Sequence, residues 1–238
     1  MYKVKALIPI LATLFLIGCA QVTITGSGNV VTQEEDLTGF DKLDVSGSFN
    51  VDVMQGENFR VVVRVDDNLV EHLDIVKQGS TLKIGLKPNR IYNIRNATME
   101  AEVTMPELVG LDLSGSSEAN ISGFESTKSL VVDLSGNSEL FGDIRAGDAR
   151  FNLSGNSSVT LTGSAADVEV DVSGSSDADL SEFPAADAIV DASGASTVSV
   201  NLSGRLDADA SGSSDVYYLG NPTLGRMDTS GSSTIQPR

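Results

Sequence analysis

The feature that most constrains this chain is a Ser-Gly step that recurs seven times at nearly constant spacing. Neighbouring steps are separated by 18 to 21 residues, and their serines are Ser114, Ser135, Ser154, Ser173, Ser193, Ser211 and Ser230. Self-similarity at a short fixed period is typical of repeat proteins, in which each copy stacks on the next. The chain is therefore expected to form a stack of similar coils.

Apolar and polar residues alternate on both sides of each step. In the first copy Leu111 and Leu113 precede the Ser, and Ala119 and Ile121 follow it. Alternation of this kind predicts strands that have one buried face. The Gly of each step permits a sharp bend between two such strands.

A single coil of this size cannot bury enough apolar surface to offset its loss of conformational entropy, so neighbouring coils must supply contacts. A propeller blade needs about 40 residues, and a sandwich needs hairpins at irregular spacing. The predicted fold is all-β: a right-handed parallel β-helix (solenoid) of about 19-residue coils with an irregular N-terminal β subdomain. It requires Leu113, Leu134 and Leu153 to lie over one another inside the stack.

The same alternation extends upstream of the repeats. The segment "KLDVSGSFNVDV" is expected to place Leu43, Val45, Val51 and Val53 inward, and "VTITGSGNVV" to do so with Val22, Ile24 and Val30. The rhythm breaks between Met54 and Pro106, where longer strands flank "DDNLVEHL", a short helical turn with His72 at its surface. We expect residues 19–38 to form an anchor, spacer and first strand, residues 39–105 a capping β subdomain, and residues 106–238 the Ser-Gly β-helix.

The first 18 residues are typical of a secretory leader, with Lys3 and Lys5 before an apolar run that is too short to span a bilayer. This run ends in "LIGC", which resembles the bacterial lipobox and implies cleavage before Cys19 and lipidation of that residue. Cys19 is the only cysteine, so no intramolecular disulfide can form. Acyl chains on Cys19 would attach the protein to a membrane without a spanning helix.

Loss of Lys3 and Lys5 with the leader would change the formal net charge from −17 to −19. An acidic surface of this kind repels nucleic acid and anionic lipid headgroups. Solubility of an exported protein explains this charge most simply, although divalent cations are compatible with it.

The position two residues before each Ser is acidic in six of the seven copies. The column consists of Asp112, Asp133, Asn152, Asp171, Asp191, Asp209 and Asp228. These side chains are expected to face solvent as a ladder, and Ca²⁺ is one cation that could bridge them because it accepts six to eight oxygen ligands. The chain has no calcium-binding nonapeptide and no EF-hand loop, so no cofactor is the primary expectation.

A second column, three residues after each step's Ser, is serine in all seven copies. It consists of Ser117, Ser138, Ser157, Ser176, Ser196, Ser214 and Ser233. These hydroxyls either point inward and bond along the stack or cap the backbone of the turn. No base accompanies them, since the single His is distant in sequence, so a nucleophilic role is not expected.

The segments "FDKLDVSGSFNVDVMQGENFRVVVRVDDNLVEHLDIVKQGSTLKIGLK" and "VTMPELVGLDLSGSSEANI", followed by the repeats, resemble the DUF2807 family over roughly residues 40–220. That family is also called the "putative auto-transporter adhesin, head GIN domain" family. The resemblance implies an all-β fold with a β-helical C-terminal part on exported bacterial proteins, often lipoproteins. It implies no catalytic residues.

Together these features predict a non-enzymatic, lipid-anchored envelope protein that acts as a structural or adhesin-like binding scaffold. Ala20 is not the Asp that retains lipoproteins in an inner membrane, so an outer-membrane location is expected where the cell has one. The expected partners are the membrane, an envelope or surface ligand and, through free coil ends, a second copy. The alternative is a glycan-binding or glycan-active β-helix. The repeats argue against it, because they have few basic side chains and no Trp. Exposed aromatics that could stack on sugars are also few: Phe141, Tyr217 and Tyr218 in the repeats and Tyr92 before them.

Overall fold

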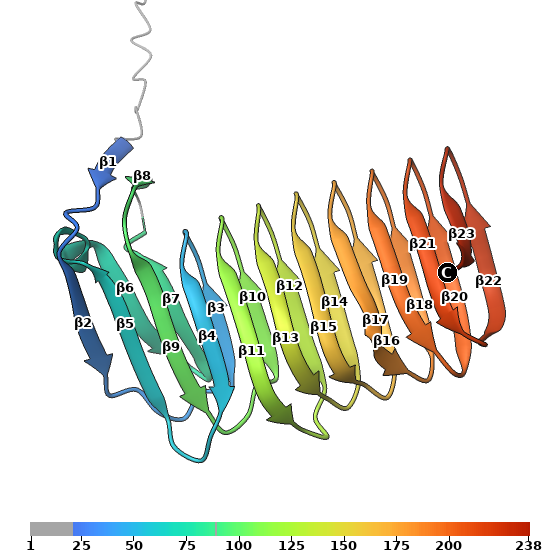
Figure 1. Cartoon of the computed structure of the whole chain (residues 1–238), viewed down its shortest axis with the longest axis horizontal. Helices are drawn as coiled ribbons and strands as arrows, with labels where there is room; N and C mark the ends of the chain where they lie inside the picture. Colours follow the sequence, from blue (N-terminus) through green and yellow to red (C-terminus); the bar gives the residue numbers. More distant parts are fainter. Residues whose placement is uncertain (1–20, 89) are drawn as a thin grey trace, which may run out of the picture.

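The computed structural model describes residues 21–88 and 90–238, and these form a β-solenoid (Figure 1). Each coil has two strands, one in a ten-stranded sheet and one in an eleven-stranded sheet. The coil strands of the ten-stranded sheet are β3 (Lys42–Val45), β10 (Gly110–Leu113), β12 (Leu130–Leu134), β14 (Ala149–Leu153), β16 (Val168–Val172), β18 (Ala188–Ala192), β20 (Arg205–Ala210) and β22 (Thr223–Thr229). Those of the other sheet are β4 (Asn50–Gln55), β11 (Glu118–Glu125), β13 (Glu139–Arg145), β15 (Ser158–Ser164), β17 (Asp177–Ala185), β19 (Thr197–Leu202), β21 (Asp215–Gly220) and β23 (Thr234–Pro237).

Like residues lie over like residues along the stack, as the repeat predicted. Leu113 pairs with Leu134 and Leu134 with Leu153, and all three are at most 2% exposed. The strands of neighbouring coils run parallel, so the buried faces of both sheets form one continuous core between them. The two strands of "KLDVSGSFNVDV" belong to this stack, because β3 pairs with β10 and β4 with β11. The predicted solenoid is confirmed.

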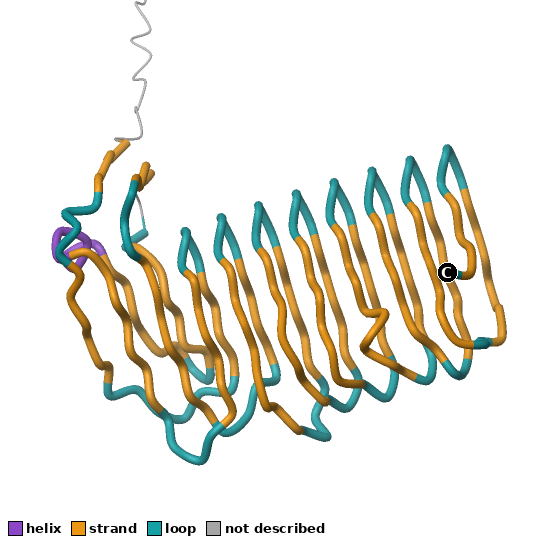
Figure 2. Tube along the Cα trace, in the orientation of Figure 1, coloured by secondary structure: helices purple, strands orange, loops and turns teal. Residues whose placement is uncertain are grey.

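The Ser-Gly turns join the two strands of each coil and form a row of narrow loops along one edge (Figure 2). The serine three residues after each step's Ser is buried in the first six turns. In five of these its hydroxyl donates to the carbonyl oxygen of the step's Ser, as Ser157 Oγ does to Ser154 O at 2.9 Å. Both predicted alternatives therefore hold in part: the serines point inward, and they cap the backbone of the turn.

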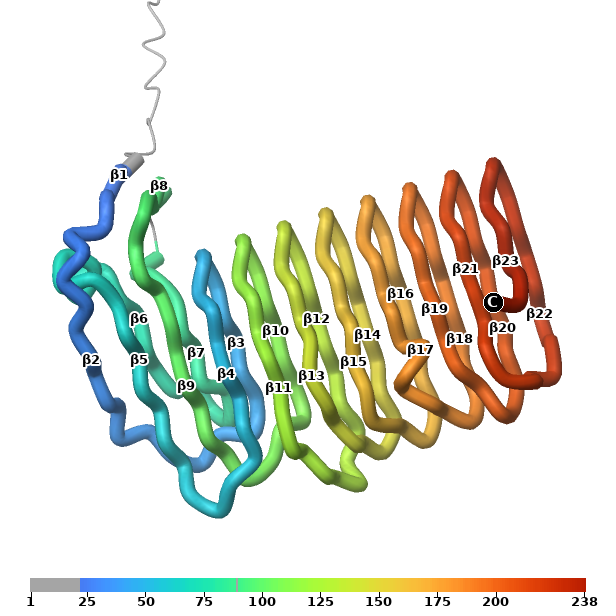
Figure 3. Tube along the Cα trace, viewed as in Figure 1, coloured from blue at the N-terminus to red at the C-terminus, as the bar shows by residue number. Residues whose placement is uncertain are grey.

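The chain between the first coil and the repeats adds strands to both sheets at the N-terminal end (Figure 3). The added strands are β5 (Arg60–Asp66), β6 (Leu73–Gln78), β7 (Thr81–Leu86) and β9 (Met99–Met105). The same segment contains the 3₁₀ helix η1 (Asp67–His72) and β8 (Ile91–Arg95), which belongs to neither large sheet. Strands β7 and β9 continue the parallel order beside β3 and β4, whereas β6 and β5 then pair antiparallel. Leu69 of η1 is fully buried, so it covers apolar core that a further coil would otherwise cover.

The segment "VTITGSGNVV" does not continue the stack, although Ile24 is buried in the core as expected and Val22 packs against that core. Strand β1 (Gln21–Thr25) pairs only with β8, in a two-stranded parallel sheet, and β2 (Val30–Glu35) runs antiparallel to β5. Val30 is 41% exposed. Alternation predicts which face of a strand is buried, but it does not predict the neighbour or direction of that strand.

A buried carboxylate ties these N-terminal segments together. Asp66 is 1% exposed, and its two oxygens accept hydrogen bonds from the backbone N–H groups of Gly28 and Thr98, each at 2.6 Å. These bonds satisfy a charge whose burial would otherwise be costly. Asp66 thereby connects the loop after β1 and the loop before β9 to the end of β5.

The predicted short helical turn in "DDNLVEHL" is confirmed as η1, but His72 is not a surface residue. Its side chain is 14% exposed and packs edge-on against Tyr92, with ring centroids 5.6 Å apart. Among the described residues, no helix has the length and hydropathy that crossing a bilayer requires.

Candidate functional site: an outer groove beside an aspartate ladder

The predicted aspartate ladder is in register on the outer face of the ten-stranded sheet. Asp112 pairs with Asp133, Asp133 with Asn152, and the pairing continues to Asp228. Asp44 of β3 precedes Asp112 and extends the column by one position. The structure thus brings the ladder residues together, as neighbours on adjacent strands.

Three other side chains partly compensate this row of carboxylates. Lys83 lies 2.8 Å from Asp44, and the Asn152 amide donates to Asp133 Oδ1 at 2.7 Å. Arg226 lies 3.3 Å from Asp228. Partial burial, together with the neighbouring charges of Asp44 and Asp133, raises the pKa of Asp112 above its usual value.

The ladder does not have the arrangement of a metal centre. No group of three or more His, Cys, Asp or Glu side chains within residues 21–88 and 90–238 converges as metal ligands would. Adjacent carboxylates on one parallel sheet point the same way, so they do not surround a common point. Binding of Ca²⁺ to the ladder therefore stays a prediction without geometric support. Cys19, the predicted lipidation residue, lies outside the described residues.

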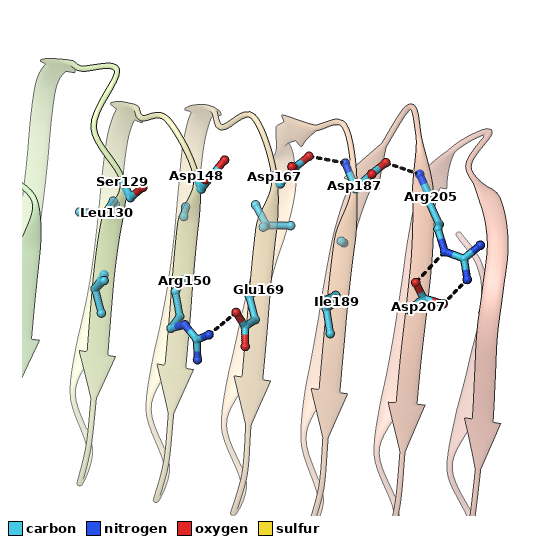
Figure 4. A pocket seen from close by; sticks show the side chains of 14 residues that line it. Ser129, Leu130, Asp148, Arg150, Asp167, Glu169, Asp187, Ile189, Arg205 and Asp207 are labelled. Carbon is cyan, nitrogen blue, oxygen red and sulfur yellow. Dashed lines mark hydrogen bonds and ion pairs between the residues drawn. The ribbon is translucent and has the colours of Figure 1, made fainter.

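A hollow that the sequence analysis did not anticipate lies on the same face, beside the ladder and nearer the starts of the strands. We call it the outer groove; it crosses β12, β14, β16, β18 and β20 and has a volume of about 500 Å³ (Figure 4). Its floor is one outward column, in which Val131, Arg150, Glu169, Ile189 and Asp207 pair in order. Val131 and Ile189 are 38% and 53% exposed.

Charged side chains in the outer groove are held by one another. Arg150 and Glu169 form an ion pair between β14 and β16, and Arg205 forms two hydrogen bonds of 2.7 Å with Asp207 (Figure 4). The hydrogen bonds from Arg205, and one from the backbone N–H of Arg226, lower the pKa of Asp207 to about 2. The groove therefore presents fixed charges that flank two exposed aliphatic side chains.

This arrangement suits recognition better than catalysis. The residues that line the outer groove include no His, Cys or Thr, and Ser129 at one end is their single hydroxyl side chain. A general acid or base works best with a pKa near the working pH, whereas the Asp207 carboxyl is shifted away from it. The signal for the groove was present in the sequence: the position four before each step's Ser mixes aliphatic and charged residues, whereas the position two before is mostly Asp.

Of the aromatic residues considered for sugar stacking, Phe141 is 38% exposed on the opposite sheet. Tyr217, Tyr218 and Tyr92 are half-buried. None of the four lines the outer groove, so the groove has no aromatic platform on which a sugar ring could stack.

The fold is shared with several solved structures of bacterial proteins. A structure described as a "putative adhesin" from Bacteroides fragilis NCTC 9343 has a TM-score of 0.81 at 20% identity, over 90% of this chain and 100% of that chain. A "putative lipid binding protein" from Parabacteroides distasonis ATCC 8503 has a TM-score of 0.69 at 24% identity, over 91% and 100% of the two chains. A "putative adhesin" from Parabacteroides merdae ATCC 43184 has a TM-score of 0.68 at 15% identity, over 91% and 99%.

Stacked parallel coils around one continuous core define the class of this protein, which is a β-solenoid. The chain belongs to the DUF2807 family, described as "Putative auto-transporter adhesin, head GIN domain", whose model matches residues 39–222. This membership suggests a surface or exported protein that is not an enzyme. Comparison with curated proteins found no match.

Proposed function

We propose that this protein is a lipid-anchored, non-catalytic scaffold of the bacterial cell envelope that binds a surface or envelope component through the outer groove. Cys19 carries the lipid, and the anchor lies in the outer membrane where the cell has one. The observation that carries the binding role is the exposure of Val131 and Ile189 on either side of the Arg150–Glu169 ion pair.

The sheet beneath supports this role. The floor residues stand on five parallel strands that are hydrogen-bonded side by side and backed by the continuous core. A contact surface on such rigid strands loses little conformational entropy on binding. Exposed aliphatic groups flanked by fixed charges offer both an apolar contact and orientation.

The order of the leader supports the anchor. A basic start, a short apolar run and "LIGC" precede Cys19, and the first described strand, β1, begins only two residues later, at Gln21. Ala20 is the residue after the cysteine. Residues 19 and 20 add at most about 7 Å of chain, so the anchored protein would lie close to the membrane surface.

Metabolic labelling tests the anchor. Cells that express wild-type protein or Cys19→Ala receive radiolabelled palmitate, and the proteins are then recovered and counted. The proposal expects label in the wild-type protein and none in the variant. Equal label in both would remove the anchor, and fractionation of the labelled protein into inner and outer membranes tests its location.

A binding screen tests the groove. The chain from residue 19 onward, made with Cys19→Ser so that it carries no lipid, is screened against glycans and envelope components. Ile189→Asp should lose the captured component, because a charge replaces the exposed aliphatic group. Met54→Asp is the matched control, because Met54 is 43% exposed on β4 in the other sheet. Capture that Ile189→Asp leaves unchanged would contradict the role of the groove.

A further inference from the structure

Positive charge is distributed unevenly along this acidic solenoid. Every basic side chain beyond Gly110 has a carboxylate within 4.0 Å. Of the described residues, five basic side chains form no ion pair: Lys42, Lys77, Lys87, Arg90 and Arg95. All five precede the repeats; Arg90 and Arg95 lie directly before and on β8, which pairs with β1, and Lys87 directly follows β7. The uncompensated cations therefore gather at the end of the molecule where the described chain begins.

Two of these cations line one hollow, which we call the N-terminal hollow. It lies between the Ser46-Gly47 turn of the first coil and the chain after β7, and its volume is about 430 Å³. Its lining comprises Ser46, Gly47, Ser48, Leu86, Lys87, Pro88, Arg90, Tyr92, Asn93, Ile94 and Met99. This lining contains no carboxylate, whereas four other hollows on the described surface each contain at least two. The N-terminal hollow is therefore locally cationic on a protein of strongly negative net charge.

The polar groups of the N-terminal hollow are mainly donors. The Lys87 ammonium donates to the backbone carbonyl of Glu71 at 2.5 Å, which holds its position but leaves its charge unpaired. Ser46, Ser48 and Asn93, whose side chains can donate hydrogen bonds, are also among the lining residues. The Tyr92 hydroxyl is buried and has no hydrogen-bond partner among the described residues. A buried hydroxyl without a partner is costly, so Tyr92 is one lining residue whose polar atom the described residues leave unsatisfied.

We propose that the N-terminal hollow binds a phosphate group. Lys87 and Arg90 supply the charge, and Arg suits phosphate because its planar guanidinium forms two parallel hydrogen bonds. The serine hydroxyls and the Asn93 amide supply neutral donors to the remaining oxygens. A phosphate is thus matched to a site that combines two free cations with several donors and lacks the carboxylates found elsewhere on the surface.

The register of β1 indicates where such a phosphate comes from. Gln21 pairs with Ile91, the residue after Arg90, so the first described residue of the chain lies beside the segment that lines the N-terminal hollow. If Cys19 is lipidated, as the proposed function requires, the hollow lies near the lipid headgroups, where each basic side chain contributes about 1 kcal/mol of attraction to an anionic surface. A headgroup phosphate and a free phosphate ester share this chemistry, and the experiment distinguishes them.

The first arm of the experiment uses soluble phosphates and does not depend on the anchor. The Cys19→Ser chain is titrated with inorganic phosphate and with glycerol 1-phosphate while backbone amide shifts are followed by NMR. If the hollow binds phosphate, we expect saturable amide shifts that are confined to residues 86–94 and the turn at Gly47. Lys87→Gln with Arg90→Gln should weaken binding at least tenfold. Both side chains are exposed, so the double variant should keep the wild-type melting temperature.

A charge-matched double variant is the control. Arg145→Gln with Arg238→Gln removes the same two charges at positions outside the hollow, and it should bind phosphate as the wild type does. Equal weakening in both double variants would show general electrostatics and overturn the site. The proposed site would also be overturned if neither phosphate caused saturable shifts and the second arm showed no vesicle-dependent protection.

The second arm couples the wild-type chain through Cys19, its only cysteine, to a maleimide lipid in vesicles. Hydrogen exchange of residues 86–95 is compared on phosphatidylglycerol and phosphatidylcholine vesicles. If the ligand is a headgroup phosphate, these amides should be protected more strongly on phosphatidylglycerol than on phosphatidylcholine vesicles. The Lys87→Gln/Arg90→Gln double variant should lose this difference. Phosphate binding in solution without this protection identifies a free phosphate as the ligand. Phosphate binding together with failed palmitate labelling would remove the anchor and leave the site standing.

Discussion

A Cβ atom added to Gly155 would lie 2.6 Å from the carbonyl oxygen of Gly136 in the preceding coil. The same contact recurs between successive Ser-Gly turns, and the glycines have φ near +80°. This close approach brings the turn backbones near enough to hydrogen-bond, as the Asn156 N–H does to Gly136 O at 2.7 Å. The Gly of the repeat is thus required by the neighbouring coil as well as by the bend.

Replacement of Gly155 by Ala should therefore destabilise the stack. The positive φ costs about 1–2 kcal/mol for a residue with a Cβ, and the contact with backbone adds roughly 1–3 kcal/mol. We expect the free energy of unfolding to fall by about 2–5 kcal/mol in urea denaturation followed by circular dichroism.

Gly47 provides a control for this prediction. It occupies the same turn of the first coil with φ +100°, but a Cβ there would have no atom within 4 Å. Gly47→Ala should therefore show only the conformational part, about 1–2 kcal/mol. Equal losses at the two positions would show that stacking of the turns is not what requires glycine.

The buried serine column should contribute to stability in the same turns. Ser157→Ala removes the hydrogen bond to Ser154 O and should lower the free energy of unfolding by about 0.5–1.5 kcal/mol. Ser233→Ala should cost less, because Ser233 is only half-buried and water can replace its hydroxyl. Chemical denaturation of the two variants compares them, and a larger loss at Ser233 would contradict this reasoning.

The raised pKa of Asp112 predicts a pH-dependent gain from Asp112→Asn. The folded protein protonates this carboxyl more readily than the unfolded chain does, so its favourable contribution is complete below about pH 3.8 and is lost as pH rises through the folded pKa. At pH 7 the Asn variant should melt about 1–2 °C higher, since it removes a charge repelled by Asp44 and Asp133.

The gain from Asp112→Asn should vanish near pH 3, where Asp112 is itself neutral. Asp228→Asn should give no gain at either pH, because Arg226 lies 3.3 Å from that carboxylate. Thermal melts of both variants at the two pH values give the comparison. A gain of equal size at pH 3 would show that the effect is not electrostatic.

The Asp207 carboxyl should titrate well below the usual range of an aspartate. NMR should show its side-chain carboxyl carbon shift changing near pH 2. Its depressed pKa contributes stability above the usual value of 3.8, and that contribution is lost as pH falls toward 2. Arg205→Gln should raise the pKa of Asp207 only part of the way back to its usual value, because the hydrogen bond from the Arg226 backbone N–H remains. An unchanged pKa in this variant would show that Arg205 is not the main cause.

The solenoid could be predicted because it depends on local periods. Alternation places Leu111 and Leu113 inward on a strand wherever that strand pairs, and a constant spacing brings equivalent residues of successive coils into register. The Ser-Gly turn, the core column and the aspartate ladder all follow from these two regularities. Each concerns residues that are neighbours in the repeat.

The N-terminal arrangement and both hollows depend instead on which strands pair, and in which direction. Val30 has the alternation of a coil strand, yet β2 runs antiparallel at the sheet edge and leaves it exposed. Ser46 and Arg90 line one hollow because β3 pairs with β7. Val131 and Ile189 flank one groove because three strand pairings align them. Local alternation determines which face of a strand is buried. The total burial and hydrogen bonding of the folded chain determine which strands become its neighbours. Those neighbours then bring the surface groups together.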